Sequence, residues 1–206
     1  MDNDTSLINV LIAPNRFFGA LGAGRERIGL PALIVLISAL ITGAGAYLMA
    51  SSMTMIDVPD VDPATMQMIT GAGAAFFAFF TVMLAWAIGS LIMHVIVKIL
   101  GGTGSFKSTL STVGYASLLQ VFAGLLTLAV FLIYHPDVDA IAAGGVAALG
   151  TMAPVMAVTA IVGFVVMVWS VVIEAYGLVH AHDLPLGKAL IAPAVMAIIS
   201  MVLGLI

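Results

Sequence analysis

All lysines and arginines of this chain fall in alternate breaks between five long apolar segments. The six cations are Arg16, Arg25, Arg27, Lys98, Lys107 and Lys188. The other two breaks carry acids and no cation: Asp57, Asp60, Asp62, Asp137 and Asp139. Cytoplasmic loops of membrane proteins collect Lys and Arg. The pattern therefore predicts five transmembrane spans, with the N-terminus in the cytoplasm and Ile206 outside.

The composition excludes an ordinary soluble domain. Hydrophobic residues make up 63% of the chain, charged residues make up 8%, and the mean hydropathy is +1.24. There is no cysteine, so no disulfide, thiolate metal site or catalytic thiol can form. Residues Met1 to Asp4 are acidic, whereas a cleavable signal peptide begins with a basic region, so we expect none. Only helices satisfy their own backbone in lipid without closing a barrel, so the predicted fold is an all-α bundle.

A cytoplasmic segment at the membrane interface, residues 1–27, precedes a five-span membrane domain, residues 28–206. About 20 apolar residues are needed for one crossing. The predicted spans are 28–51, 73–97, 108–134, 152–176 and 188–206. Residues 64–72 would extend the second span outward or continue it at a tilt. The form of the outer segment 135–152 stays open.

Small residues recur at helical spacing in two places. Gly71, Ala74, Ala75 and Ala78 form one such face, and Ala157, Ala160 and Gly163 form the other. Faces of this kind allow helices to approach closely in lipid. We predict packing within the bundle, with contacts between copies of the chain as the alternative.

The N-terminal segment combines apolar residues with cations. Leu7 to Ile12 and the pair Phe17 and Phe18 alternate with Arg16, Arg25 and Arg27. This pattern suits a segment lying in the inner membrane interface. A docking surface for a cytoplasmic partner is the alternative.

The candidate site is a set of polar side chains at the predicted inner ends of the spans. Its members are Arg16, His94, Lys98, Lys107, Tyr115, Glu174, His180, His182, Asp183 and Lys188. We expect the loops 101–107 and 180–188 to lie together beside the N-terminal segment. The cations would then surround Glu174 and Asp183, and would contact anionic lipid headgroups or a cytoplasmic partner. Plain interfacial anchoring, a polar network between helix ends, and contact with a ligand or ion are the other interpretations.

The motifs in these loops do not indicate a phosphate-binding or metal-binding site. The run from Gly101 to Ser108 has Phe106 where a phosphate-binding loop requires glycine, so it predicts a tight loop capped by Ser105 or Ser108. The run His180-x-His182-Asp183 with Glu174 matches no zinc signature. We therefore expect no metal, no cofactor, no nucleic-acid partner and no enzymatic activity.

Three stretches of the sequence resemble a known family. They are Leu11 to Phe18, Gly101 to Ser117, and Trp169 to Leu190. Together they resemble the Yip (Ypt-interacting protein) domain family, which implies five crossings with the N-terminus inside. Gly114 and Tyr115 match the Gly-Tyr pair of that family early in the third span.

Eukaryotic members of that family bind Rab-type GTPases in endoplasmic reticulum and Golgi membranes. This sequence lacks their long cytosolic N-terminal region and its Asp-Leu-Tyr-Gly-Pro motif, and it is more similar to the compact prokaryotic members. The resemblance therefore implies the fold and topology without small-GTPase binding. It also favours the cell membrane, or the endoplasmic reticulum or Golgi in a eukaryote.

Two functions are compatible with the sequence. The first is a non-enzymatic membrane scaffold that binds other membrane proteins or copies of itself, or shapes the bilayer. The second is permeation of a small solute, ion or lipid, which requires polar groups in the spans. The candidates are Thr81, Ser90, His94, Gln120, Thr127, Thr159, Ser170 and Glu174.

Overall fold

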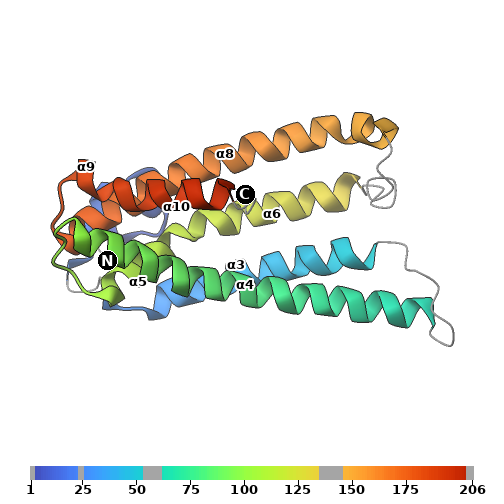
Figure 1. The fold of residues 1–206 in the computed structure, drawn as a ribbon, viewed down its shortest axis with the longest axis horizontal. Coiled ribbons are helices and arrows are strands. Elements are labelled where there is room, and N and C mark those ends of the chain that lie inside the picture. Colours follow the sequence, from blue (N-terminus) through green and yellow to red (C-terminus); the bar gives the residue numbers. More distant parts are fainter. Residues whose placement is uncertain (1–2, 23–25, 53–61, 135–145, 203–206) are drawn as a thin grey trace.

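Long apolar helices run side by side along the molecule (Figure 1). The computed structural model describes residues 3–22, 26–52, 62–134 and 146–202, with backbone only for 146–155. Four helical stretches are long and apolar enough to cross a membrane: Gly29–Ser51, Pro63–Ile99, Phe106–Ile133 and Met156–His182. A fifth, Leu186–Val202, is apolar but shorter. The predicted all-α class is confirmed.

Helix α3 (Gly29–Ser51) and helix α4 (Pro63–Ile99) form the most closely packed pair. Asp62 caps α4, because its carboxylate accepts a hydrogen bond from the Thr65 backbone N–H at 3.1 Å. Pro63 then occupies the first turn, where it costs no hydrogen bond. Residues 64–72 are therefore part of one continuous helix of 37 residues. Its length of about 55 Å exceeds the hydrocarbon thickness of about 30 Å.

The third apolar segment divides into two helices, α5 (Phe106–Ala116) and α6 (Leu118–Tyr134). Helix α5 packs against α3, α4 and α8 (Val146–His182). Its buried face is polar and carries Ser108, Thr109, Ser111 and Thr112. The centre of the bundle beside α5 thus contains hydroxyl groups as well as apolar side chains.

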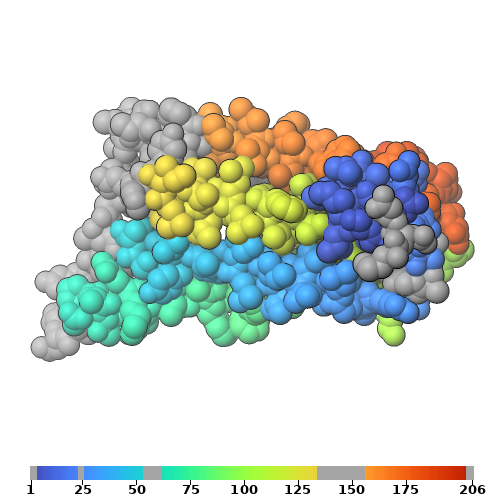
Figure 2. All heavy atoms as spheres, turned by 180° about the vertical axis from the view of Figure 1, so that it is seen from behind, coloured from blue at the N-terminus to red at the C-terminus, as the bar shows by residue number. Residues whose placement is uncertain are grey.

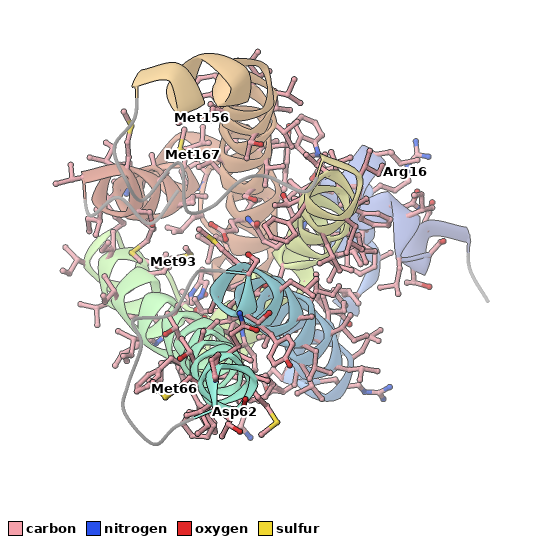
Figure 3. All side chains as sticks on the ribbon, turned by 90° about the vertical axis from the view of Figure 1, so that its right-hand side faces the viewer. Arg16, Asp62, Met66, Met93, Met156 and Met167 are labelled. Atoms are coloured by element: carbon pink, nitrogen blue, oxygen red, sulfur yellow. The ribbon has the colours of Figure 1, made fainter. Side chains whose placement is uncertain are left out.

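The last helices are short. Helix α9 spans Leu186–Ala189 and helix α10 spans Ile191–Val202. The 12 residues of α10 measure about 18 Å, which is shorter than one crossing. Seen along the bundle in Figure 3, α10 lies between α4 and α8, and it packs against both.

The N-terminal segment packs against one end of the bundle (Figure 2). It comprises η1 (Asn3–Thr5), α1 (Ile8–Ile12) and α2 (Pro14–Ala20). We expected its apolar side chains in the membrane interface. Ile8 and Ile12 are exposed, but Val10, Phe17 and Phe18 are buried in the protein core.

The two small-residue faces have different environments. A Cβ on Gly71 would lie 2.9 Å from the Tyr47 ring, and one on Gly43 would lie 3.2 Å from the Ala75 carbonyl oxygen. The first face therefore packs α4 against α3. A Cβ on Gly163 would meet nothing within 4 Å, and Ala157 and Ala160 are exposed. The second face is not covered by any described residue.

Several expectations concern residues outside the described part of the chain. They are Arg25, Asp57, Asp60, Asp137, Asp139, the outer segment 135–145 and Ile206. The predicted position of Ile206 outside the membrane stays a prediction.

Candidate functional site

One end of the bundle, here called the basic end, gathers the predicted site. It consists of residues 3–22, the loop 100–105, the segment 183–190 and the adjoining ends of α4, α5 and α8, which carry Lys98 and Lys107. The loop and the segment lie together, because the Thr103 backbone N–H donates to the His182 carbonyl at 3.1 Å. The Thr103 hydroxyl also bonds Asp183 at 3.0 Å.

Glycines make this close approach possible. Gly101 has φ +97, a backbone conformation that L side chains rarely adopt. A Cβ on Gly104 would lie 1.9 Å from the Ala181 carbonyl oxygen. Ser105 then caps α5, since its hydroxyl accepts the Ser108 backbone N–H at 3.3 Å. The predicted tight loop with a serine cap is confirmed.

Two histidines share one hydroxyl group beneath this loop. The Thr109 hydroxyl lies 2.9 Å from His94 Nδ1 and 2.7 Å from His182 Nε2. Thr109 and His182 are fully buried. A hydroxyl has one proton to donate. When Thr109 donates to one ring, the other ring must therefore donate its N–H to Thr109, so the two tautomers are coupled.

A second set of bonds fastens the N-terminal segment to α8. His180 Nε2 lies 2.8 Å from the Asn15 side-chain oxygen. The Trp169 indole N–H donates to the Leu11 carbonyl at 2.8 Å. Glu26, which follows the N-terminal segment, accepts a hydrogen bond from Ser105 at the start of α5 rather than from α8. Sequence reasoning had selected His180 but not Asn15 or Thr109, and the run of hydroxyl residues after Phe106 was the signal for the latter.

The lysines do not pair with Glu174. Lys98 Nζ donates to the Thr103 carbonyl at 3.2 Å, and Lys188 Nζ donates to the Leu100 carbonyl at 3.3 Å. Lys107 is exposed and has no hydrogen bond or ion pair with any described residue. Both bonded lysines thus donate to uncharged carbonyls of the loop 100–105, so their positive charges remain at this surface.

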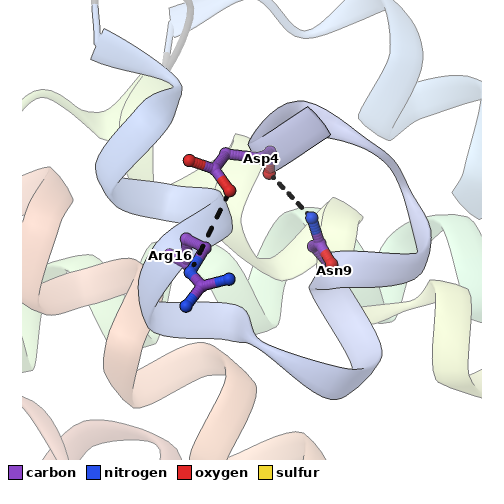
Figure 4. Close-up of polar contacts among 3 residues, drawn as sticks. All are labelled: Asp4, Asn9 and Arg16. Atoms are coloured by element: carbon purple, nitrogen blue, oxygen red, sulfur yellow. Dashed lines mark hydrogen bonds and ion pairs between the residues drawn. The ribbon is translucent and has the colours of Figure 1, made fainter. Parts of the chain in front are cut away.

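Arg16 and Tyr115 lie on the side of the N-terminal segment. Figure 4 shows Arg16 Nε beside the Asp4 carboxylate at 4.0 Å, with the Asn9 side chain donating to the Asp4 carbonyl. This pair is exposed, so its net contribution is small. The Tyr115 ring is 5% exposed and packs edge-on against Phe17 and Phe18. Tyr115 therefore anchors the N-terminal segment to α5.

Glu174 lies away from the other residues of the predicted site. It lies eight residues before the end of α8, or about 12 Å along the helix. It is half-buried and has no hydrogen bond or ion pair with any described residue. The expected ring of cations around Glu174 does not form, because the lysine side chains turn to the loop carbonyls instead. Nor does any group of three His, Asp or Glu in the described ranges lie close enough to hold a metal ion.

Comparison with known proteins identifies the family. The model of the Yip1 domain matches residues 8–206. The chain belongs to the Yip1 domain family. Its resemblance to that family in the loop and third-span motifs is thereby confirmed.

A curated relative is the uncharacterized protein MJ0794 of Methanocaldococcus jannaschii. It is 33% identical over 123 residues, which cover 60% of this chain and 86% of the relative. No solved structure matches the chain significantly. The Yip1 assignment establishes a multi-pass membrane protein from a family without enzymatic activity, and it leaves the specific role open.

Proposed function

We propose that this Yip1-family protein is a membrane scaffold in the cell membrane, with the basic end as its partner-binding surface. The observation that carries this proposal is the interlocked basic end. Hydrogen bonds join the N-terminal segment, α4, α5, α8 and two loops there. Lys98, Lys107 and Lys188 remain at its surface. A rigid, positive platform suits anionic lipid headgroups or an acidic cytoplasmic partner, at about 1 kcal/mol per cation.

The environment of other polar groups favours a scaffold over permeation. The hydroxyls of Thr42, Ser117 and Thr127 donate to backbone carbonyls four residues earlier, so each is engaged within its own helix. A hollow of about 330 Å³ lies between α3 and α4 and has an apolar lining that includes Ala39, Leu40, Gly43 and Phe76. Neither feature offers a solvated route for an ion.

The proposal includes an orientation with the basic end in the cytoplasm. The chain has no cysteine, so single cysteines can be introduced cleanly. We expect Asp60→Cys to react with a membrane-impermeant maleimide in intact cells and Lys107→Cys to react only after the cells are opened. Reaction of Lys107→Cys in intact cells would refute the orientation.

The scaffold function is tested by crosslinking and flux together. Lys107→Cys carrying a thiol-linked crosslinker should form adducts of defined mass in native membranes. The Lys98→Gln/Lys188→Gln background should weaken these adducts, because it removes two of the three neighbouring cations. The purified protein in vesicles should show no saturable flux of ions or small solutes. Saturable flux without adducts would establish the permeation alternative instead.

A further inference from the structure

Three helices of the basic end meet at one hydroxyl group. His94 comes from α4, Thr109 from α5 and His182 from α8. The Thr109 hydroxyl lies 2.9 Å from His94 Nδ1 and 2.7 Å from His182 Nε2, and the centroids of the two rings are 5.4 Å apart. Thr109 thus links α4 to α8 through two short hydrogen bonds.

The second nitrogen of His182 fixes the direction of these bonds. His182 is fully buried, and its Nδ1 has no hydrogen-bond partner in the described chain. Nδ1 faces the backbone of the loop 100–105, since a Cβ on Gly104 would lie 2.9 Å from it. A proton on Nδ1 would therefore lack an acceptor, so the neutral ring carries its proton on Nε2 and donates it to Thr109. Thr109 then donates to His94 Nδ1, which leaves the proton of His94 on Nε2.

Protonation of His94 breaks this sequence of donors and acceptors. His94 is half-buried, so it is the ring of the pair that a proton can reach. An imidazolium carries a proton on both nitrogens and accepts no hydrogen bond. Both rings would then donate to the Thr109 oxygen, and the Thr109 proton would lose its acceptor. The other arrangement moves the proton of His182 to Nδ1, where no described group accepts it. Each arrangement weakens the link between α4 and α8.

The cations of the basic end add to this effect. Lys98 follows His94 by one turn on α4. Lys107 and Lys188 lie at the same end, on α5 and α9. A proton gained by His94 therefore adds to an excess of positive charge.

The acidic groups near the pair do not offset that charge. The Asp183 carboxylate accepts a hydrogen bond from the Thr103 hydroxyl, and Glu174 lies about two turns before the end of α8. The loop 100–105 and α10 contain no ionisable side chain, and His180 bonds Asn15 of the N-terminal segment. No carboxylate of the described residues forms an ion pair with His94.

We infer that His94 is a proton sensor whose protonation loosens α8 from α4 at the basic end. Histidine is the side chain suited to such a switch, because its charge changes near neutral pH. The inference goes beyond the proposed scaffold function, since it concerns the position of two helices and requires no partner.

A distance measurement at two pH values tests the inference. Spin labels would be attached by Ile99→Cys at the end of α4 and Leu186→Cys on α9, which follows α8; both positions are exposed. The full chain in nanodiscs would be studied by double electron–electron resonance. We expect the distance distribution to become about twice as broad between about pH 7.5 and about pH 5.5.

Two histidine variants separate the sensor from its neighbours. His94→Gln keeps an amide that can bond Thr109 but cannot gain a proton, so the distribution should stay narrow at both pH values. His180→Gln is the matched control, because it also removes a histidine of the basic end but one that bonds the N-terminal segment. This control should keep the full response to pH.

The protonation states can also be observed without any variant. Solid-state NMR of the chain labelled with heavy nitrogen in histidine distinguishes the two tautomers and the imidazolium. We expect both rings to be neutral with the proton on Nε2 at about pH 7.5, and His94 alone of the pair to become charged at about pH 5.5. This measurement decides the matter even if His94→Gln does not fold.

Four results would overturn the inference: equal widths at both pH values, a response that survives His94→Gln, a response that is lost in His180→Gln, or a neutral His94 in acid. The crosslinking of Lys107→Cys at neutral pH does not depend on protonation of His94. Intact adducts together with any of these four results would thus remove this inference and leave the scaffold function standing.

Discussion

The basic end and the far half of the bundle are stabilised in different ways. At the basic end, side chains from α4, α5 and α8 and the loop 100–105 are joined by hydrogen bonds such as those of Thr109 and Thr103. In the far half, α4 and α8 scarcely touch, and exposed side chains such as Phe77 and Ile161 cover their surfaces. Directional bonds fix one arrangement, whereas apolar helices in lipid have little drive to associate. The comparison teaches that the basic end fixes α8 relative to α4, whereas α3 and α4 also pack on each other in the far half, as at Gly71 and Tyr47.

The largest expected effect comes from filling the tightest contact at the basic end. Gly104→Ala places a methyl group 1.9 Å from the Ala181 carbonyl oxygen. The loop must move away from α8, so we expect a loss of about 3 kcal/mol in the free energy of unfolding. Thermal and denaturant unfolding in detergent would measure it. Gly73→Ala in the far part of α4 has open space and serves as the control; equal losses would contradict the comparison.

Removing the shared hydroxyl should have the next largest effect. Thr109→Val keeps the shape of the side chain but leaves one nitrogen of His94 and one of His182 without a partner. Buried unsatisfied groups are costly, so we expect a loss of about 2 kcal/mol. Thr127→Val is the matched control, because that exposed hydroxyl bonds only its own helix. Comparable unfolding curves for the two variants would show that the His-Thr-His cluster does not hold the end together.

Loosening the N-terminal segment should lower the free energy of unfolding by a smaller amount. Asn15→Ala removes a hydrogen-bond partner of His180 at 2.8 Å, which we expect to lower the free energy of unfolding by about 1 kcal/mol. The Trp169 indole bonds Leu11 of the same segment, so its fluorescence should also shift as the segment loosens. Asn9→Ala removes a side chain that donates to the Asp4 carbonyl within that segment, and it should leave the fluorescence unchanged. An unchanged spectrum in Asn15→Ala would indicate that the apolar contacts of Phe17 and Phe18 suffice.

The smallest effect concerns the exposed ion pair. Arg16→Gln should change the unfolding free energy by less than about 0.5 kcal/mol, because Arg16 and Asp4 are exposed and 4.0 Å apart. Titration with salt should likewise have little effect on stability. A larger loss would mean that charge, rather than hydrogen bonding, organises this end.

The sequence was sufficient for features that depend on local signals. The glycines and Ser105 predict the tight capped loop, and the distribution of lysines predicts which helix ends lie together. It was not sufficient to tell protein core from lipid, because both are apolar. Phe17 and Phe18 were therefore expected in the membrane interface, although they are buried against Tyr115. Glu174 was expected among cations for a similar reason, since the sequence does not reveal which way the flexible lysine side chains turn.

Distance measurements between spin labels test the difference between the two regions most directly. One pair would be placed at the basic end, by Lys107→Cys with Lys188→Cys. The other would be placed in the far half, by Met68→Cys on α4 with Met156→Cys on α8, two exposed positions. Double electron–electron resonance in nanodiscs should give a narrow distance distribution for the first pair and a broad one for the second. Equal widths, or a narrower distribution in the far half, would contradict the claim that the basic end fixes α8 relative to α4.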